Sequence, residues 1–358
     1  MSTTTISIIS WNVLSQDLVQ PQMDAWCKKG PFYPSDEIFD DKYRYEKWKK
    51  QTLQWMKEEQ IISFQELPDY WYFKFEKEEK INCREQYHII IKFYPCIFDS
   101  RMSVALFIPK NKYTVIGEIC ISMEELFYND EHDEIQKKWS EEEMSFWRQK
   151  RKPHPFLSVH VKTKDDEKKN IIISTSHFPC WFYMPNIMSY ILKKCIDSLL
   201  SWSFFLFEKN QKKIHWALFG DFNMMPKEVN DTISSYFISS QDESRKDAAE
   251  IYTFFTEESK ECTTICVGNR DPDQPYNKNC FFGCLDHMVW GKIGGAPEGE
   301  EKDMVKCLSK LPFAPDNMEM WKKEMYLPCH SFEFYPDVIP NQNCISDHYP
   351  LLWSITIN

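Results

Sequence analysis

Short runs of apolar, often β-branched residues recur along the chain, and most of them end at a polar residue or a charged turn. Such runs predict buried strands. They lie at residues 6–14, 61–64, 89–98, 103–108, 156–162, 170–176, 214–219, 286–290 and 351–357. The charged stretch at 164–169 separates two of these runs and predicts a hairpin.

Other segments repeat their apolar residues every three or four positions, which predicts amphipathic helices. One covers residues 46–59, and a longer one begins at Pro185, a residue type favoured at the first helical position. Residues 122–150 hold nine acidic and four basic residues, and we expect a mostly solvated helical insertion on the domain edge. Strands alternate with helices in places and form hairpins elsewhere, so the prediction is one mixed α/β domain over residues 1–358.

Composition and charge narrow the classes of function. The 358 residues are 42% hydrophobic and carry a net charge of −11, which disfavours a protein that coats duplex nucleic acid through a basic surface. The 13 cysteines show no disulfide-scaffold spacing and fit buried thiols in a reducing compartment. We find no secretory signal and no apolar run long enough to cross a membrane. We therefore expect a cytoplasmic location, with the nucleus as the alternative.

Polar groups follow several of the predicted buried strands. They are Trp11-Asn12, Gln65-Glu66, Gly220-Asp221-Phe222-Asn223 and Ser346-Asp347-His348. A sheet holds such groups rigidly, and hard oxygen ligands of this kind suit Mg²⁺, for which Mn²⁺ could substitute. Each motif alone is weak, because a single Asn or Asp at a strand end is usually structural. Their order along the chain carries the prediction.

The ordered series Trp-Asn, Gln-Glu, Ser-His, Gly-Asp-Phe-Asn, Leu-Asp-His and Ser-Asp-His-Tyr-Pro-Leu resembles the endonuclease/exonuclease/phosphatase superfamily. The start at residues 10–16, the block at 281–290 and the ending at 339–348 resemble its deadenylase branch, which contains the nocturnin, angel, Ccr4-type and 2′,5′-phosphodiesterase families. The resemblance implies a four-layer α/β sandwich, with two packed mixed β-sheets flanked by helices.

The resemblance also implies roles for single residues. Glu66 would be the main metal ligand with Asn12 beside it, and Asp347 would support a metal or its water. Asp221 would position or deprotonate the attacking water. The remaining implied roles are phosphate contacts by His177, Asn223 and His348, support of His348 by Asp286, and stacking of an adenine on Phe281. A core position for Phe281 is an equal alternative.

The implied function is a Mg²⁺-dependent phosphodiesterase, with a 3′-to-5′ exoribonuclease acting on poly(A) or other adenylate-rich RNA as the leading hypothesis. A 2′,5′-oligoadenylate phosphodiesterase, a nocturnin-like NADP(H) phosphatase and a DNA-repair endonuclease are alternatives. A catalytically inactive interaction module is an alternative of another class, although every catalytic position is filled. The sequence has no leucine-rich repeat region, so we expect any recruitment to a larger assembly to use another surface.

Several residues differ from the pattern of the deadenylase branch, and these differences concern the expected substrate pocket rather than the metal site. The tyrosine expected after the catalytic aspartate is His287, and Ile345 replaces the proline before Ser-Asp-His. Pro179-Cys180-Trp181 stand where nocturnin has basic residues. A four-thiolate zinc site at Cys262, Cys266, Cys280 and Cys284 is a weaker prediction.

Overall fold

The computed structural model describes residues 4–19, 39–96, 100–122, 125, 139–150, 154–165, 169–181, 183–210, 212–239, 249–253, 264–266, 281–283, 285–294, 304–310, 346, 348 and 350–357. These residues form two six-stranded sheets. The first has the order β13 (Met304–Lys310), β14 (Leu351–Ile357), β1 (Thr4–Asn12), β2 (Ile61–Pro68), β4 (Arg101–Pro109), β3 (Tyr87–Pro95). The second has the order β5 (Tyr113–Ser122), β6 (Pro155–Thr163), β7 (Asn170–His177), β8 (Ile214–Asp221), β12 (Asp286–Ile293), β9 (Ala249–Thr253).

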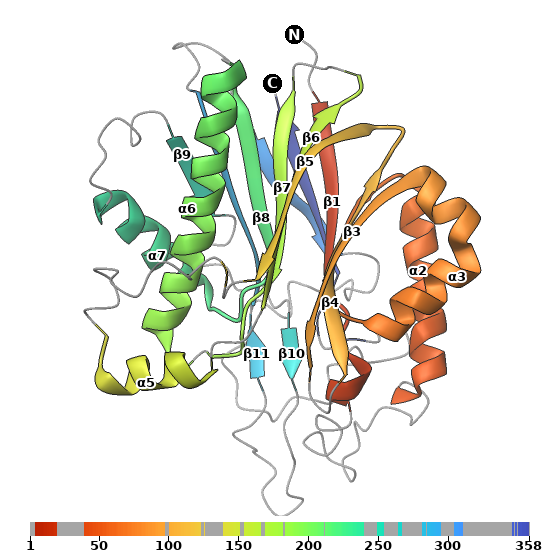
Figure 1. Ribbon diagram of the computed structural model, residues 1–358, viewed down its shortest axis with the longest axis horizontal. Coiled ribbons are helices and arrows are strands. Elements are labelled where there is room, and N and C mark those ends of the chain that lie inside the picture. Colours follow the sequence, from red (N-terminus) through yellow and green to blue (C-terminus); the bar gives the residue numbers. More distant parts are fainter. Residues whose placement is uncertain are drawn as a thin grey trace, which may run out of the picture.

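Both sheets are mixed. β1 pairs in parallel with β2 and antiparallel with β14, and β7 pairs in parallel with β8 while β12 pairs antiparallel with it. A short antiparallel pair, β10 (Thr264–Cys266) with β11 (Phe281–Gly283), lies at one end of the sandwich (Figure 1). The two parallel pairs bring strand ends to the same edge of each sheet, which positions the site described below.

Helices cover the outer faces of both sheets (Figure 1). α2 (Asp41–Lys57) and α3 (Asp69–Gln86) lie against the first sheet, and α6 (Pro185–Asn210) and α7 (Pro226–Ser239) lie against the second, with α5 (Glu141–Lys150) beside the lower end of α6. The predicted four-layer α/β sandwich is thereby confirmed.

The core explains why these sequences form these layers. Every residue of β2, β7 and β8 is buried, because each of these strands packs between a facing sheet and a helix layer. Some polar side chains between the sheets pair with each other: Ser63 Oγ donates to Thr175 Oγ1 at 2.8 Å, and Gln65 Nε2 donates to the same oxygen at 3.0 Å. These bonds join β2 of one sheet to β7 of the other next to the predicted site.

The structure also differs from the sequence prediction in places. α2 begins at Asp41 rather than at residue 46, because Asp40 caps it by accepting the N–H of Tyr43 at 2.8 Å. α3, α7 and β5 were not predicted. Of the segment 122–150, residue 122 ends β5 and 141–150 form α5, while the interpretation of the whole segment as a helical insertion stays a prediction. Three of the four cysteines of the zinc prediction lie outside the described residues.

Among the helices that the structure describes, none has both the length and the apolar character needed to cross a bilayer.

Candidate active site

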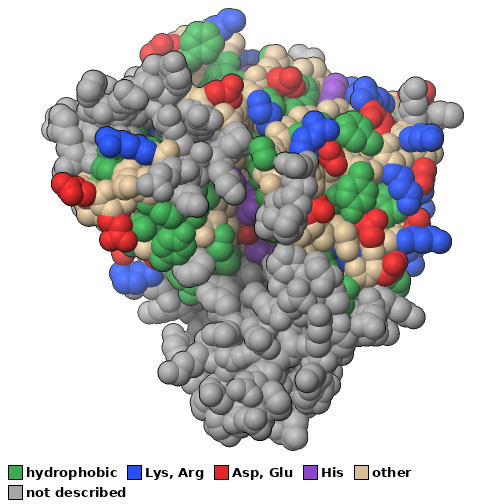
Figure 2. Space-filling view, turned by 60° about the horizontal axis from the view of Figure 1, so that its bottom comes forward, with side chains coloured by type: hydrophobic (Ala, Val, Ile, Leu, Met, Phe, Trp, Pro, Cys, Tyr) green, Lys and Arg blue, Asp and Glu red, His purple; other side chains and the backbone are tan. Residues whose placement is uncertain are grey.

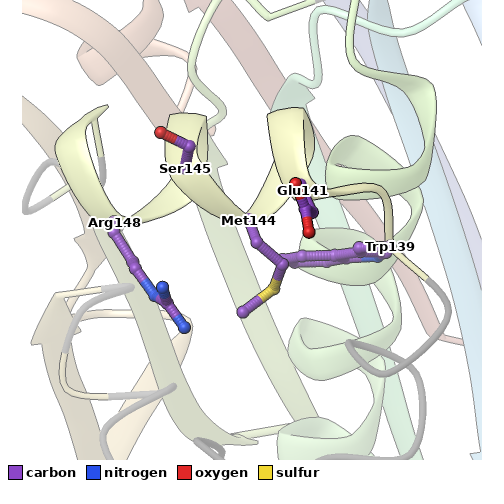
Figure 3. A pocket seen from close by; sticks show the side chains of 5 residues that line it. All are labelled: Trp139, Glu141, Met144, Ser145 and Arg148. Carbon is purple, nitrogen blue, oxygen red and sulfur yellow. The ribbon is translucent and has the colours of Figure 1, made fainter.

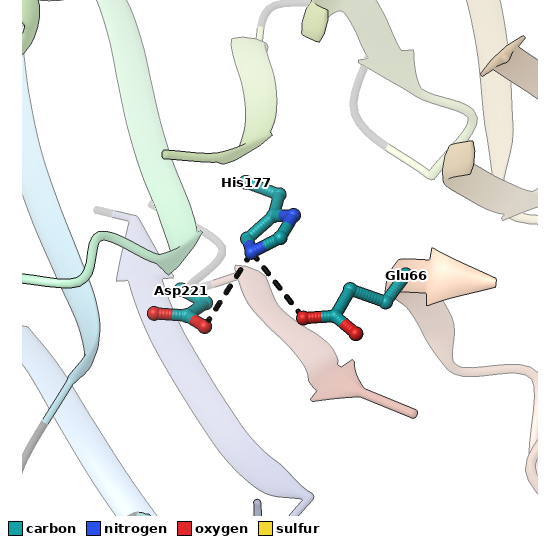
Figure 4. A group of neighbouring side chains, drawn as sticks. All are labelled: Glu66, His177 and Asp221. Atoms are coloured by element: carbon teal, nitrogen blue, oxygen red, sulfur yellow. Dashed lines mark ion pairs between the residues drawn. The ribbon is translucent and has the colours of Figure 1, made fainter. Parts of the chain in front are cut away.

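Five of the predicted site residues lie at strand ends that the pairing brings together. Asn12 ends β1, Glu66 lies near the end of β2, His177 ends β7, Asp221 ends β8 and Asp286 begins β12. Asp221 is opposite His177 on one side and opposite Asp286 on the other. Figure 4 shows Glu66, from the first sheet, on one side of His177 and Asp221, from the second, on its other side. The strand topology thus assembles residues that are far apart in sequence.

The Asn12 side chain links the two sheets. Its Nδ2 donates to Glu66 Oε1 at 2.9 Å and to Asp221 Oδ2 at 3.0 Å. Its Oδ1 accepts the backbone N–H of Leu14 at 3.0 Å, and that bond fixes which end of the amide is oxygen because a backbone nitrogen only donates. Asn12 therefore presents its NH₂ group to the carboxylates in this conformation. Its role as a metal ligand stays a prediction, and would need a rotamer that turns the oxygen inward.

Backbone conformation aims two further side chains. Glu66 and Asn223 have φ values of 55° and 49°, a left-handed conformation that is uncommon outside glycine and concentrates at functional sites. Glu66 Oε2 accepts the backbone N–H of Ser15 at 3.1 Å. Asn223 donates its backbone N–H to Asp221 Oδ1 at 2.9 Å and its Nδ2 to the Phe178 carbonyl at 2.8 Å. Asn223 therefore holds Asp221 in place, and its contact with phosphate stays a prediction.

His177 lies between the two carboxylates. Its Nε2 is 3.4 Å from Glu66 Oε1 and 3.8 Å from Asp221 Oδ2, while its Nδ1 is 2.7 Å from the Tyr94 hydroxyl (Figure 4). Carboxylate oxygens only accept when ionised, so the ring proton belongs on Nε2 and the hydroxyl of Tyr94 donates to Nδ1. This tautomer makes His177 a donor toward the space between Glu66 and Asp221.

His348 approaches from the other side of Asp221. Its Nδ1 donates to Asp286 Oδ2 at 2.8 Å, which leaves Nε2 facing Asp221 Oδ2 at 3.5 Å. Ser346 accepts the His348 N–H at 3.1 Å and donates to the Asn12 carbonyl at 2.6 Å, tying this segment to β1. The structure thus places Asp286 behind His348, in the arrangement that fixes an imidazole tautomer.

Burial shifts the protonation of two groups in opposite directions. Burial raises the pKa of Asp221 from 3.8 to about 7, against the opposing influence of His348, because the charged carboxylate loses water. Burial lowers the pKa of His177 from 6.5 to about 3, and the charge of His348 lowers it further. His177 is therefore neutral near pH 7, in keeping with its role as an Nε2–H donor.

The donor set fits a hard divalent cation. Among the described residues, Glu66, His177 and Asp221 are buried and bring ligand atoms within 4.8 Å of one another. Two buried carboxylates that share one amide group are stabilised by positive charge nearby, because burial removes the water that would solvate them. Mg²⁺ binds through one or two carboxylates while keeping its own waters. Glu66 is the residue that would hold such a cation, with Asp221 beside it to position a water, because His177 directs a proton rather than a lone pair inward.

Two predicted site residues are not placed. Asp347 lies outside the described residues, and for Phe281 the backbone of β11 is described but the side chain is not. Two residues that the motifs did not identify belong to the site's support. Tyr94 orients His177, and the buried guanidinium of Arg44 donates to the carbonyls of Val13 and Leu14 at 2.9 and 2.5 Å. Arg44 therefore fixes the loop that carries the Ser15 N–H to Glu66.

The surface is hollowed at this site. Figure 2 shows histidine and acidic side chains at the bottom of a hollow between the two halves of the molecule.

Comparison with solved structures agrees with this architecture. The human nocturnin catalytic domain, solved with a bound sulfate anion, superimposes with a TM-score of 0.54 at 14% identity, covering 99% of this chain and 96% of that one. ANGEL2, described as a 2′,3′-cyclic phosphatase, superimposes with a TM-score of 0.56 at 13% identity, covering 99% and 95%. A second ANGEL2 structure, in complex with adenosine-2′,3′-vanadate, gives 0.56 at 14% identity, covering 99% and 96%.

No model of a protein family matches the sequence, and no curated protein sequence matches it. At these identities the structural likeness establishes the fold. Nocturnin and ANGEL2 are members of the superfamily whose motifs are present in the sequence. The chain therefore has the fold of the endonuclease/exonuclease/phosphatase superfamily, the fold that the motifs predicted.

Proposed function

We propose that this protein is a Mg²⁺-dependent hydrolase of phosphodiester bonds that acts as a 3′-to-5′ exoribonuclease on adenylate-rich RNA. The observation that carries the proposal is the convergence of Glu66 and Asp221, from different sheets, on the amide of Asn12, with His177 and His348 flanking them. Structural cores rarely bury two carboxylates against one donor, whereas phosphate-hydrolysing sites need that charge.

In this proposal each group of the site has a task in hydrolysis. Asp221, steadied by Asn223 and Asn12, orients the attacking water and accepts its proton. His177 donates through Nε2 to a phosphate oxygen, and Tyr94 keeps the proton on that nitrogen. His348, held by Asp286, meets the phosphate from the opposite side. A bound Mg²⁺ would polarise the phosphoryl oxygen and stabilise the leaving oxygen.

The choice of RNA and adenylate is supported by the motifs. The blocks at 10–16, 281–290 and 339–348 resemble the deadenylase branch, in which the position of Phe281 stacks an adenine. A second candidate is hydrolysis of a terminal 2′,3′-cyclic phosphate, which the likeness to ANGEL2, solved with adenosine-2′,3′-vanadate, favours. Both reactions place an adenosine next to the reacting phosphorus, so one site can be tested for both.

A substrate panel tests the proposal. We expect Mg²⁺-dependent shortening of poly(A) from its 3′ end, and no activity in EDTA. Parallel arms contain a 2′,3′-cyclic-phosphate-ended oligoadenylate, 2′,5′-linked oligoadenylate, NADPH and abasic DNA. Turnover confined to one other arm would replace 3′-to-5′ shortening of poly(A) as the proposed reaction. Absence of Mg²⁺-dependent turnover in every arm would contradict the enzyme proposal and favour an interaction module.

Tyr94→Phe tests the orientation of His177. Losing the hydroxyl frees the imidazole to change tautomer, and we expect kcat to fall about 10- to 100-fold, as outer-shell partners typically contribute. Because the ring of phenylalanine fills the same volume, the melting temperature should stay within a few degrees of wild type.

A spectroscopic readout separates this positioning role from a structural one. In wild type, ¹⁵N chemical shifts of His177 should report the Nε2–H tautomer, and in Tyr94→Phe they should show a mixture. Tyr113→Phe, another buried tyrosine that contacts no site residue in the described structure, is the control. An unchanged tautomer with an unchanged kcat would contradict the assignment.

A further inference from the structure

A row of aromatic rings leads from His177 to the surface of the molecule. The His177 and His154 ring centroids are 5.8 Å apart, and those of His154 and Trp181 are 6.3 Å apart. Trp181 lies 5.3 Å from Phe146, and Phe146 lies 5.6 Å from Tyr183. The row thus begins at a group of the active site and continues without a break to the outside.

The outer rings of this row are exposed in part. Tyr183 is 55% exposed, and Phe146 and Trp181 are only partly buried. Single exposed aromatic residues are common on protein surfaces, but a contiguous group that borders a functional site marks a binding surface. Figure 2 shows hydrophobic side chains gathered to the left of the hollow that contains the histidines.

The two segments that supply these rings are fixed to each other. Trp181 and Tyr183 follow β7 in a turn, where the Met184 N–H donates to the Trp181 carbonyl at 2.7 Å. Phe146 comes from α5, which Asn186 joins to the start of α6 by donating to Glu143 Oε1 at 2.8 Å. The buried ring of Trp147 lies against Trp181 at 6.3 Å and 84°. The outer rings are therefore held in place before any ligand arrives.

The charge of this region argues for bases rather than phosphates as the ligand. α5 opens with Glu141, Glu142 and Glu143, and the chain carries a net charge of −11. A basic strip would recognise a nucleic-acid backbone, whereas aromatic rings stack on bases whatever the local charge. Stacking also needs bases that are not already stacked in a duplex, so the surface fits single strands.

A pocket on the face of α5 that points away from Phe146 is a separate feature from the hollow at the active site. Its volume is about 620 Å³, and it is lined by Trp139, Glu141, Met144, Ser145 and Arg148 (Figure 3). Glu141, Met144, Ser145 and Arg148 follow the i, i+3, i+4, i+7 spacing of one helical face, whereas Phe146 lies on the opposite face of α5. This pocket is therefore not part of the aromatic row.

We propose that Phe146, Trp181 and Tyr183 form a stacking subsite for the bases of a single-stranded nucleic-acid substrate beyond the nucleotide at the reacting phosphate. This inference rests on the proposed function and extends it, because it predicts that substrates longer than a dinucleotide bind better. It also gives a role to α5, within the acidic segment, and to Trp181, which stands where nocturnin has basic residues.

Chain-length dependence of hydrolysis tests the subsite. We compare an adenylate dinucleotide with an octanucleotide, with Mg²⁺ present, in wild type, Tyr183→Ala, Trp181→Ala and Trp181→Phe. We expect the ratio of the octanucleotide KM to the dinucleotide KM to rise about tenfold or more in the alanine variants. Trp181→Phe keeps a ring and should restore most of the loss. Phe205→Ala is the matched control, since Phe205 is 59% exposed on α6 and outside the row.

A measurement of oligonucleotide binding without hydrolysis separates the test of the subsite from the test of the proposed function. Binding of the labelled octanucleotide to Asp221→Asn protein is measured in EDTA, with and without Tyr183→Ala. Hydrolysis with equal octanucleotide KM in all variants would overturn the subsite and leave the proposed function standing. If no arm shows hydrolysis, the proposed function fails, and the binding measurement alone decides the subsite. Equal binding with and without Tyr183→Ala, or preference for a duplex, would overturn it.

Discussion

We expect the replacement of Asp221 by asparagine to lower kcat by about 10²- to 10⁴-fold, because the proposed role of Asp221 is that of a positioned general base. The amide keeps the size of the side chain and can still accept the N–H of Asn223, which now lies 2.9 Å from Asp221 Oδ1. The asparagine amide cannot accept a proton from water. Its NH₂ group would also face a donor, either the NH₂ group of Asn12 or the backbone N–H of Asn223. The measurement is the initial rate of oligoadenylate shortening at saturating substrate and Mg²⁺.

The control for this variant is Asp231→Asn. Asp231 is an exposed acid on α7 that pairs only with Lys227 at 2.8 Å among the described residues, and such pairs stabilise a protein by about 0 to 1 kcal/mol. We expect its kcat to equal that of wild type. Substantial poly(A) hydrolysis by Asp221→Asn, at a rate within a few fold of wild type, would remove Asp221 from the site.

A comparison of wild type with Asp221→Asn also tests the protonation state of Asp221. In the metal-free wild type the folded pKa of about 7 exceeds the ordinary value of 3.8, so the folded state holds the proton more tightly. As pH rises from about 4 to about 7, the unfolded carboxylate ionises first and the free energy of unfolding falls. The pKa of His177 is lowered to about 3, so this residue has the opposite effect: its contribution to the free energy of unfolding decreases as pH falls below 6.5. Only the difference between wild type and Asp221→Asn isolates the carboxylate.

We therefore expect the free energy of unfolding of metal-free Asp221→Asn, relative to that of metal-free wild type, to increase as pH rises from about 4 to about 7. Mg²⁺ favours the ionised carboxylate, so the increase in melting temperature that it gives wild type should be larger at about pH 8 than at about pH 5. A pH-independent difference between the two proteins, measured by denaturant unfolding, would show that Asp221 is ionised throughout.

The sequence predicted the elements that carry a clear period and the residues that end them. Asn12, Glu66 and Asp221 could be placed because each ends or follows a continuous apolar run. α3 escaped prediction although Trp71 and Phe75 have helical spacing, because charged residues dilute the pattern and Glu79 interrupts the helix with non-helical angles. Short runs show where a strand lies, but they do not show which strands become neighbours.

The contacts between segments that are distant in sequence could not be predicted from any local pattern of residues. Tyr94 meets His177 across 83 positions of sequence and from the opposite sheet, and nothing in the alternation of β3 distinguishes it from its neighbours. Arg44 is different, because it lies on the same helical face as Trp48 and Trp55, which predicts burial. Its partners, the carbonyls after Asn12, still depend on tertiary structure. Donor and acceptor directions, such as the inward NH₂ of Asn12, likewise appear only with coordinates.

Replacing Gly220 by alanine should destabilise the protein by at least about 3 kcal/mol, because two separate costs coincide there. Its φ of 135° lies in a region that residues with a side chain rarely adopt, and a Cβ would stand 2.1 Å from the carbonyl oxygen of Ser176. Backbone atoms cannot rotate away as a flexible side chain can. Relief therefore requires β7 and β8 to separate at the point where they carry His177 and Asp221, which are paired directly beside Ser176 and Gly220.

Gly117→Ala provides the matched comparison within the other part of the same sheet. A Cβ there meets only Trp202 Cζ2 at 3.5 Å, an ordinary contact, so we expect a change within about 1 kcal/mol. Urea unfolding of both variants gives the free energies. Because the distortion in Gly220→Ala falls on the strand pair that holds the site, any protein that remains folded should also lose Mg²⁺-dependent stabilisation, whereas Gly117→Ala should keep it. A Gly220→Ala protein as stable as wild type would mean that β7 and β8 pair differently at this point.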